Sequence, residues 1–340
     1  MLRVRTARES DIDGVLKLAH QAFPGMTTLP PERDVLASKL SASVNSVIKA
    51  VQEPADETYF LVMEDGIDGP LVGTAAIIAS LGQHDEFYSY QLNKVTQSCK
   101  ELDKKVSFET LNLTNHFEGF AEVATLFLSP EYRKHGNGKL LAKSRYLFMA
   151  QFRQRFPESV MADLRGYFDD HGRSPFWEAV GRYFFEMEFA EADLYGAING
   201  NQFIQDLMPK QPIYVNLLPE EAQRVIGRPN VKGKPALEML RNEGFEWHGF
   251  VDIFDAAPSV DTHIDDITTI TDSSLATVTD TFAESRADDV TAIIANSELS
   301  NFATTRGELR ISNAGEVAVH TAVADALQLS DGSSIRFVRL

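Results

Sequence analysis

The segment Ala121–Leu141, AEVATLFLSPEYRKHGNGKLL, decides the fold of this chain. Its apolar run Val123–Leu128 is short enough for a buried strand. Pro130 ends that run, because proline has no N–H to donate to a neighbouring strand. The loop Arg133–Gly138 follows, and leucines and aromatic residues then recur at helical spacing. Free backbone N–H groups and the positive end of a helix dipole meet at such a helix N-terminus. The segment therefore predicts a strand, a phosphate-binding loop and a helix.

The loop residues suit a phosphate ligand of a particular kind. Gly136 and Gly138 let a ligand approach the backbone closely, and Arg133 and Lys134 add positive charge. The chain lacks G-x-x-x-x-G-K-[ST], and a dinucleotide fingerprint needs a third glycine and a later acidic residue. The form R-x-x-G-x-G after a strand instead resembles the acyl-CoA loop of the GCN5-related N-acetyltransferase (GNAT) superfamily. Such glycines also occur in surface turns, but the flanking strand and helix favour acyl-CoA.

Length and charge limit the function. A chain of 340 residues buries a sizeable core, and 44% hydrophobic and 24% charged residues are typical of a globular protein. The net charge of −17 argues against a nucleic-acid partner, since phosphates require a basic surface. The same charge fits a cationic substrate, although acidic proteins often use it for solubility alone.

Other sequence features indicate a cytoplasmic, metal-free protein. No apolar run reaches the ~18 residues of a membrane span, and no apolar segment follows the first arginines as in a signal peptide. The single cysteine, Cys99, excludes an internal disulfide and a cysteine-rich metal site. His84 and His116 lack metal-ligand spacing.

The order of elements predicts an α/β (α+β) fold, a mixed central sheet flanked by helices. The residues predict the following elements: an edge strand 2–6, a helix after Ser10 or Asp11, a helix 31–51, strands 59–63 and 71–78, an insertion of about 82–118, a helix 137–156, and a strand 160–164. We expect an acyltransferase domain over 1–255. Residues 256–340 form an acidic C-terminal region with a small β element, because 251–305 carries eleven acids and only one base, Arg286. We expect 251–305 to be a peripheral part of the fold.

Four sequence blocks together resemble the arginine N-succinyltransferase family: TLFLSPEYRKHGNGKLLAKSRYLFMAQF, DDHGRSPFWEAVGRYFFEMEF, LMPKQPIY and EGFEWHGFVDIFDAAP. The resemblance implies a GNAT-like fold and transfer of a succinyl group from succinyl-CoA to the α-amino group of L-arginine. It places succinyl-CoA on Leu126. We assign Phe127, Leu128 and Asn137 to the same succinyl-CoA site, together with the loop residues Arg133, Lys134, Gly136 and Gly138. Succinyl-CoA is then a co-substrate, and no cofactor is permanently bound.

The chain departs from the family at one site. The family assigns a histidine as proton donor where this chain has Asn230, in Val225–Gly233. An amide cannot exchange protons as imidazole does near pH 7. His171, which follows the predicted strand 160–164, is an alternative proton donor. In an N-acyltransferase this strand splays away from the strand before the phosphate loop, here Val123–Leu128, and the acyl chain lies in the gap between them.

Glu122 and Asp163 are candidate ligands for a cationic acceptor, because each lies in or beside an apolar strand. A structural pair with an arginine such as Arg165 is the alternative. Two function classes remain open: an active N-succinyltransferase, or a CoA-binding regulatory or non-catalytic subunit of a heteromeric enzyme. Another amine acceptor is a further alternative. The partners are small molecules rather than nucleic acid or membrane, and the chain can form a homo- or hetero-oligomer.

Overall fold

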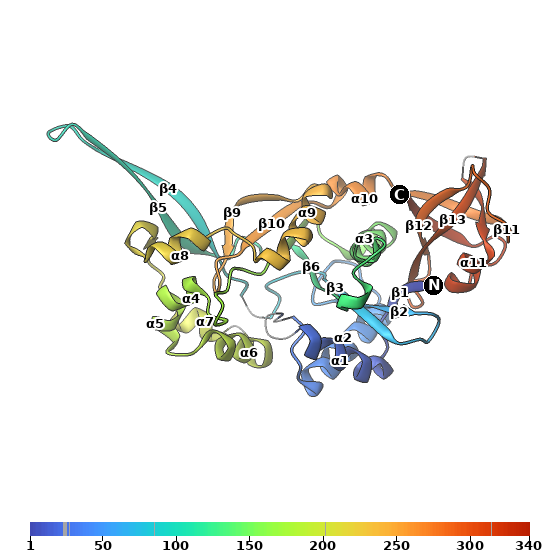
Figure 1. The fold of residues 1–340 in the computed structure, drawn as a ribbon, viewed down its shortest axis with the longest axis horizontal. Coiled ribbons are helices and arrows are strands. Elements are labelled where there is room, and N and C mark those ends of the chain that lie inside the picture. Colours follow the sequence, from blue (N-terminus) through green and yellow to red (C-terminus); the bar gives the residue numbers. More distant parts are fainter. Residues whose placement is uncertain (23–25, 27, 85, 201, 314) are drawn as a thin grey trace.

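The computed structural model describes residues 1–340 except 23–25, 27, 85, 201 and 314. The molecule is elongated, with a central sheet, a projecting two-stranded arm at one end and a small barrel at the other (Figure 1). The predicted α/β fold with a mixed sheet flanked by helices is confirmed.

The central sheet carries the predicted segment in its middle. Its strands, in spatial order, are β1 (Leu2–Thr6), β2 (Thr58–Asp65), β3 (Leu71–Ile78), β6 (Ala121–Leu128), β7 (Ser159–Asp163), β10 (Pro258–His263) and β9 (Glu246–Asp252). Neighbouring strands are antiparallel except β6 and β7, which are parallel.

Helices cover both faces of this sheet because its strands alternate their side chains. Phe60 and Val62 of β2 face the pair α1 (Ile12–Ala22) and α2 (Arg33–Ile48). The intervening Tyr59, Leu61 and Met63 face α3 (Asn137–Gln151) on the other side. This period of two is the normal pleat of a strand that is buried on both faces. The helices α9 (Lys234–Asn242) and α10 (Thr268–Thr271) join the α3 side.

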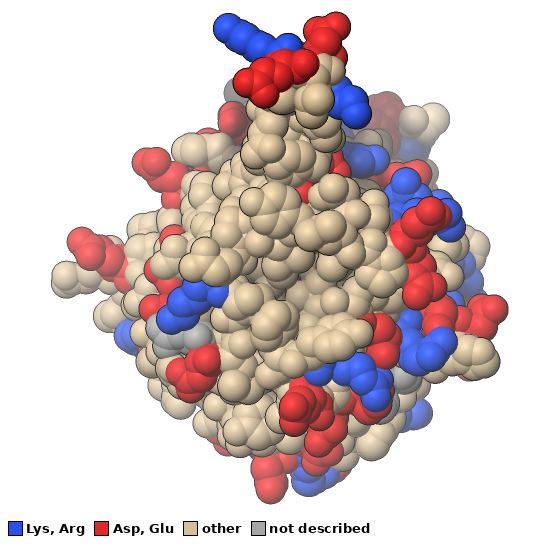
Figure 2. Space-filling view, turned by 90° about the vertical axis from the view of Figure 1, so that its left-hand side faces the viewer, with Lys and Arg blue, Asp and Glu red and all other residues tan. Residues whose placement is uncertain are grey.

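The predicted insertion forms an arm. Strands β4 (Ser89–Cys99) and β5 (Lys104–Thr114) pair along their whole length, and only the base of β4 pairs with β9. The arm projects from the body (Figure 1), and charged side chains gather at its tip above a broad uncharged face (Figure 2).

A helical cluster lies beside the arm around the buried Trp177. Its elements are α4 (Pro175–Ala179), α5 (Gly181–Phe185), α6 (Phe189–Asn199), α7 (Gln202–Leu207), β8 (Ile213–Tyr214) and α8 (Glu220–Val225). Short 3-10 helices connect elements throughout: η1 (Glu9–Asp11), η2 (Pro130–Tyr132), η3 (Arg153–Arg155), η4 (Val215–Leu217), η5 (Val231–Gly233) and η6 (Ile264–Asp266).

The small β element is a closed barrel. Its strands are β11 (Ser274–Phe282), β12 (Val290–Asn296), β13 (Ala303–Asn313), β14 (Glu316–His320) and β15 (Ser334–Arg339), with α11 (Thr321–Leu327) packed against them. The order β12-β15-β11-β14-β13 closes on itself because β12 also pairs with β13. Closure pairs the two strands that would otherwise be the edges of this sheet.

Two expectations need correction. Residues 251–305 are only partly peripheral, because β10 lies between β7 and β9 in the central sheet, whereas β11 and β12 belong to the barrel at one end of the molecule (Figure 1). The predicted division at residue 255 stays a proposal, and the strand pairings favour a boundary just before Ser274.

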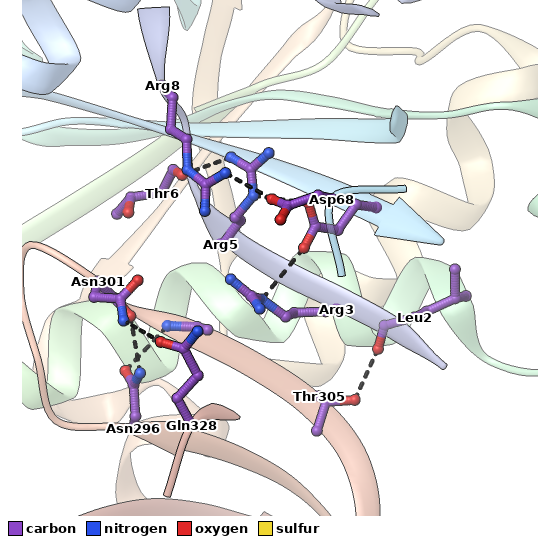
Figure 3. Close-up of polar contacts among 12 residues, drawn as sticks. Leu2, Arg3, Arg5, Thr6, Arg8, Asp68, Asn296, Asn301, Thr305 and Gln328 are labelled. Atoms are coloured by element: carbon purple, nitrogen blue, oxygen red, sulfur yellow. Dashed lines mark hydrogen bonds and ion pairs between the residues drawn. The ribbon is translucent and has the colours of Figure 1, made fainter. Parts of the chain in front are cut away.

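The strand Leu2–Thr6 is not an edge strand, since it lies between β2 and β13. Its arginines are buried rather than exposed. Arg5 donates to both Asp11 oxygens at 2.8 and 2.9 Å and to Glu64 at 2.8 Å, and Arg3 lies 3.3 Å from Glu64. Figure 3 shows Arg3 and Arg5 beside the link to the barrel, where Thr305 Oγ1 donates to the Leu2 carbonyl at 2.7 Å.

Candidate active site

A bulge bends β6 in its middle. Thr125 has a φ of +55°, and the pairing with β3 shifts register between Thr74 and Ala76. Thr74 Oγ1 donates to the Thr125 carbonyl at 3.0 Å and so holds the bulge. A bulge turns the following residues and interrupts the regular ladder.

Beyond its first residues β6 separates from β7. The two strands pair only at Ala121 with Val160 and at Glu122 with Met161. No described strand pairs with Val123–Leu128 on that side. The predicted splayed gap is therefore present. Its edge offers backbone N–H and C=O groups to an extended ligand, as in β-strand addition.

The loop after β6 is shaped by two left-handed residues. His135 has a φ of +52° and Gly136, the N-cap of α3, a φ of +76°. Successive turns of this kind point N–H groups into one anion-binding concavity. A Cβ at Gly138 would meet no atom within 4 Å, so the start of α3 lies open there.

Two of the predicted ligands also support the loop. Arg133 Nε donates to the Leu128 carbonyl at 2.8 Å, and its guanidinium lies 5.6 Å from the centre of the Phe127 ring. Buried Asn137 donates from its amide to the Tyr132 carbonyl at 3.0 Å. Arg133 thus fixes the loop to the end of β6, and Asn137 fixes the start of α3 to η2, whereas Lys134 is exposed.

Glu122 lies at the point where the strands separate. Its side chain is 7% exposed, and burial raises the pKa of its carboxyl to about 7 against the attraction of Lys39 and Arg145. Within the described part of the chain, no group donates a hydrogen bond to this carboxylate. Arg145 Nη1 instead donates to the Ala124 carbonyl at 3.4 Å. A carboxyl with a pKa near neutrality can take a proton from an amine.

Asp163 stands at the end of β7 with other acids. It is half-buried, and Ser259 Oγ donates to its Oδ1 at 2.5 Å. Burial, and then the negative charges of Asp252, Glu122 and Asp255, raise its pKa well above the ordinary value. The two predicted acceptor ligands, Glu122 and Asp163, thus lie close enough for the charge of one to affect the pKa of the other.

Sequence reasoning missed Asp252 and Asp255. Both have raised pKa values, chiefly because of burial. Asp255 accepts hydrogen bonds from Gly166 N at 2.7 Å and Ala257 N at 2.9 Å. The charges acting on Arg165 are those of Asp255 and Asp193 rather than Asp163. Two acids within the apolar run 250–257 were the available signal, since buried carboxylates are costly without partners.

Asn230 lies beside the continuation of β7. Its backbone N–H donates to the Arg165 carbonyl at 2.7 Å, and Pro229 bridges Gly166. Its side-chain Oδ1 accepts from Lys232 N at 2.9 Å and caps η5. The amide therefore has a structural partner in the chain.

His171 lies on an exposed loop, where its backbone N–H donates to Asp169 at 2.8 Å. The structure records no contact of its ring with β6 or β7 among the described residues. Its role as proton donor stays a prediction.

The described residues offer neither a metal centre nor a membrane span. They contain no cluster of three His, Cys, Asp or Glu side chains placed to bind a metal ion. None of their helices combines the length and the apolar character needed to cross a membrane.

Family models cover almost the whole chain. A model described as "Arginine N-succinyltransferase beta subunit" matches residues 2–269, and one described as its C-terminal domain matches 274–339, which correspond to the barrel.

Curated proteins and a solved structure agree with this match. Arginine N-succinyltransferase of Yersinia pestis (strain Pestoides F) is 36% identical over 345 residues, covering 100% of this chain and 98% of that protein. The protein of the same name from Escherichia coli O17:K52:H18 is 37% identical over 344 residues with the same coverage. The structure of arginine/ornithine succinyltransferase subunit AI from Pseudomonas aeruginosa has a TM-score of 0.90 and 30% identity, and the match covers 100% of this chain and 98% of that chain.

Proposed function

We propose, since the chain belongs to the arginine N-succinyltransferase family, that it transfers a succinyl group from succinyl-CoA to the α-amino group of L-arginine. The chain is an acyltransferase. One observation carries the proposal: the unpaired edge of β6 leads directly into the open N-terminus of α3. An extended arm ending in phosphates fits this arrangement.

Succinyl-CoA would lie along β6 with its phosphates on the loop. The pantetheine arm pairs with the edge of Leu126–Leu128, as a further strand would. The phosphates accept hydrogen bonds from backbone N–H groups at Gly136 and Gly138, with Lys134 adding charge. Because succinyl-CoA is consumed, it is a co-substrate, and we propose that the chain acts in the cytoplasm.

The reaction requires few protein groups. The arginine amine forms a bond to the thioester carbon, the C–S bond breaks, and CoA leaves as a thiolate. Glu122 accepts the proton of the ammonium group, which its pKa of about 7 allows. A backbone N–H near the bulge at Thr125 stabilises the developing oxyanion. A thiolate leaves readily, so no strong acid is needed at Asn230.

The acids at the end of β7 suit a cationic acceptor. Burial, and then repulsion from neighbouring carboxylates such as Asp252, raise the pKa values of Asp163 and Asp255. A guanidinium bound among them would relieve that repulsion and release protons. Arginine supplies such a cation, and ornithine, which the name of the Pseudomonas relative includes, supplies a shorter one.

A CoA-binding non-catalytic subunit is the alternative to this acyltransferase activity that an assay must exclude. The Asn230 amide already caps η5, and the matching model is described as a beta subunit. In that case the chain would bind CoA normally and a partner chain would supply the chemistry.

One assay separates the two candidates. The purified chain alone is mixed with succinyl-CoA or acetyl-CoA and with arginine, ornithine or lysine, and the released thiol is measured. Turnover with succinyl-CoA and arginine supports the transferase. Tight CoA binding without turnover for any pair of substrates supports the non-catalytic subunit, and failure to bind CoA refutes both.

A further inference from the structure

The C-terminal barrel touches the phosphate loop. Arg306, on β13, donates a hydrogen bond from Nη1 to the carbonyl of His135, although the two residues are 171 positions apart. A Cβ at Gly136 would lie 3.6 Å from the same Nη1. The guanidinium thus stands directly beside the left-handed turn that begins α3.

Arg306 is held there without a neutralising acid. Among the described residues, no carboxylate pairs with it, and its side chain is exposed. Arg310, further along the same strand, differs because it pairs with Asp289 at 2.6 Å. One contact to a carbonyl leaves most of the five N–H donors of a guanidinium free.

The positive charge around the loop Arg133–Gly138 contrasts with the acidic character of the whole chain. The chain has a net charge of −17, yet Arg306 adds to the positive charges of Arg133, Lys134 and Lys139 around one loop. Glu131 of η2 offsets only part of this positive charge, and an anion bound among the four cations would offset more of it. Arginine is the preferred side chain for phosphate because its planar fork donates two parallel hydrogen bonds.

We propose that Arg306 binds a phosphate group of the CoA donor, so that the barrel supplies part of the donor site. The proposal rests on the proposed function, since it assumes that the loop binds CoA. It gives the C-terminal domain a direct role in substrate binding. The shared chemistry is a phosphate, either of the pyrophosphate or of the ribose 3′-phosphate.

The test measures binding of three ligands to the full chain and to Arg306→Gln by calorimetry: CoA, dephospho-CoA, which lacks the 3′-phosphate, and pantetheine, which lacks all phosphates. We expect CoA affinity to fall about 10- to 100-fold, the range for loss of a charge-assisted hydrogen bond. Arg339→Gln is the matched control, because Arg339 is also exposed on the barrel and its loss should leave CoA affinity unchanged.

Each pattern of results decides the proposal. A larger loss for CoA than for dephospho-CoA assigns the contact to the 3′-phosphate. Equal losses for these two, with pantetheine unaffected, assign it to the pyrophosphate. No loss for any ligand, or the same loss for all three, overturns the proposal, the latter because Arg306 would then only position the loop. If the parent chain itself does not bind CoA, the proposed function fails instead.

Discussion

Replacing Gly138 by alanine separates the stability of α3 from its binding of a ligand. Gly138 is the second residue of the helix and has no positive φ, so alanine fits its backbone. A Cβ there would meet no atom within 4 Å. Alanine should therefore stabilise the chain by about 0.5–1 kcal/mol, because glycine loses more conformational freedom in a helix. Gly136 offers no such test, since its φ of +76° strains any side chain.

CoA binding should change in the opposite direction. If the pyrophosphate lies against the backbone at Gly138, a methyl group displaces it and the affinity falls at least about tenfold, or ~1.4 kcal/mol. Denaturant midpoints measure the stability, and calorimetry with CoA measures the affinity. Gly233→Ala is the control, because its Cβ would come no closer than 3.9 Å to any atom and it lies outside the loop. An alanine variant that binds CoA as tightly as the parent would refute the assignment of this helix N-terminus to phosphate.

Three further changes test the reacting groups. In Glu122→Gln, kcat should fall on the order of 10²–10⁴-fold, and the rise of the rate through about pH 7 should disappear from the pH profile. Folded Glu122 keeps its proton up to about pH 7, whereas an ordinary glutamate loses it near 4.5, so the parent should lose stability as pH rises through that window and the variant should not; denaturation at pH 5 and pH 8 checks this. Asp163→Asn should raise the KM for arginine well above any change for succinyl-CoA, and equal KM changes would exclude a direct contact. Asn230→His should raise kcat with little change in KM if a proton donor is useful there, and unchanged steady-state kinetics would show that the thiolate leaves unaided.

The functional strand, loop and helix were predictable because their signals are local. An apolar run, a proline, two glycines and a helical repeat occur in Ala121–Leu141, and each acts through its nearest neighbours. The separation of β6 from β7 was predicted only through the family resemblance. The bulge at Thr125 gave no signal, since a β-branched residue rarely adopts positive φ and tertiary contacts impose it here.

Features that depend on distant pairings could not be predicted in the same way. Arg3 and Arg5 give β1 the charged alternation of an edge strand, and only the positions of Glu64 and Asp11 show why the arginines are buried. The many acids of 251–305 led to the prediction of a peripheral segment. A single sequence does not show which of those acids share one buried site. Nothing in the sequence distinguishes Arg306 from other surface arginines, because its contact with the loop joins residues 171 positions apart.

The position of β1 between β2 and β13 has a consequence for synthesis of the chain. Thr305, which donates to the Leu2 carbonyl, is made 303 residues after Leu2. At ~5–20 residues per second this delay is roughly 15–60 s. During that interval one edge of β1 has no partner, and Arg3 stands at that edge. A ribosome-bound chain that ends before residue 303 should therefore require chaperone protection that the released protein does not.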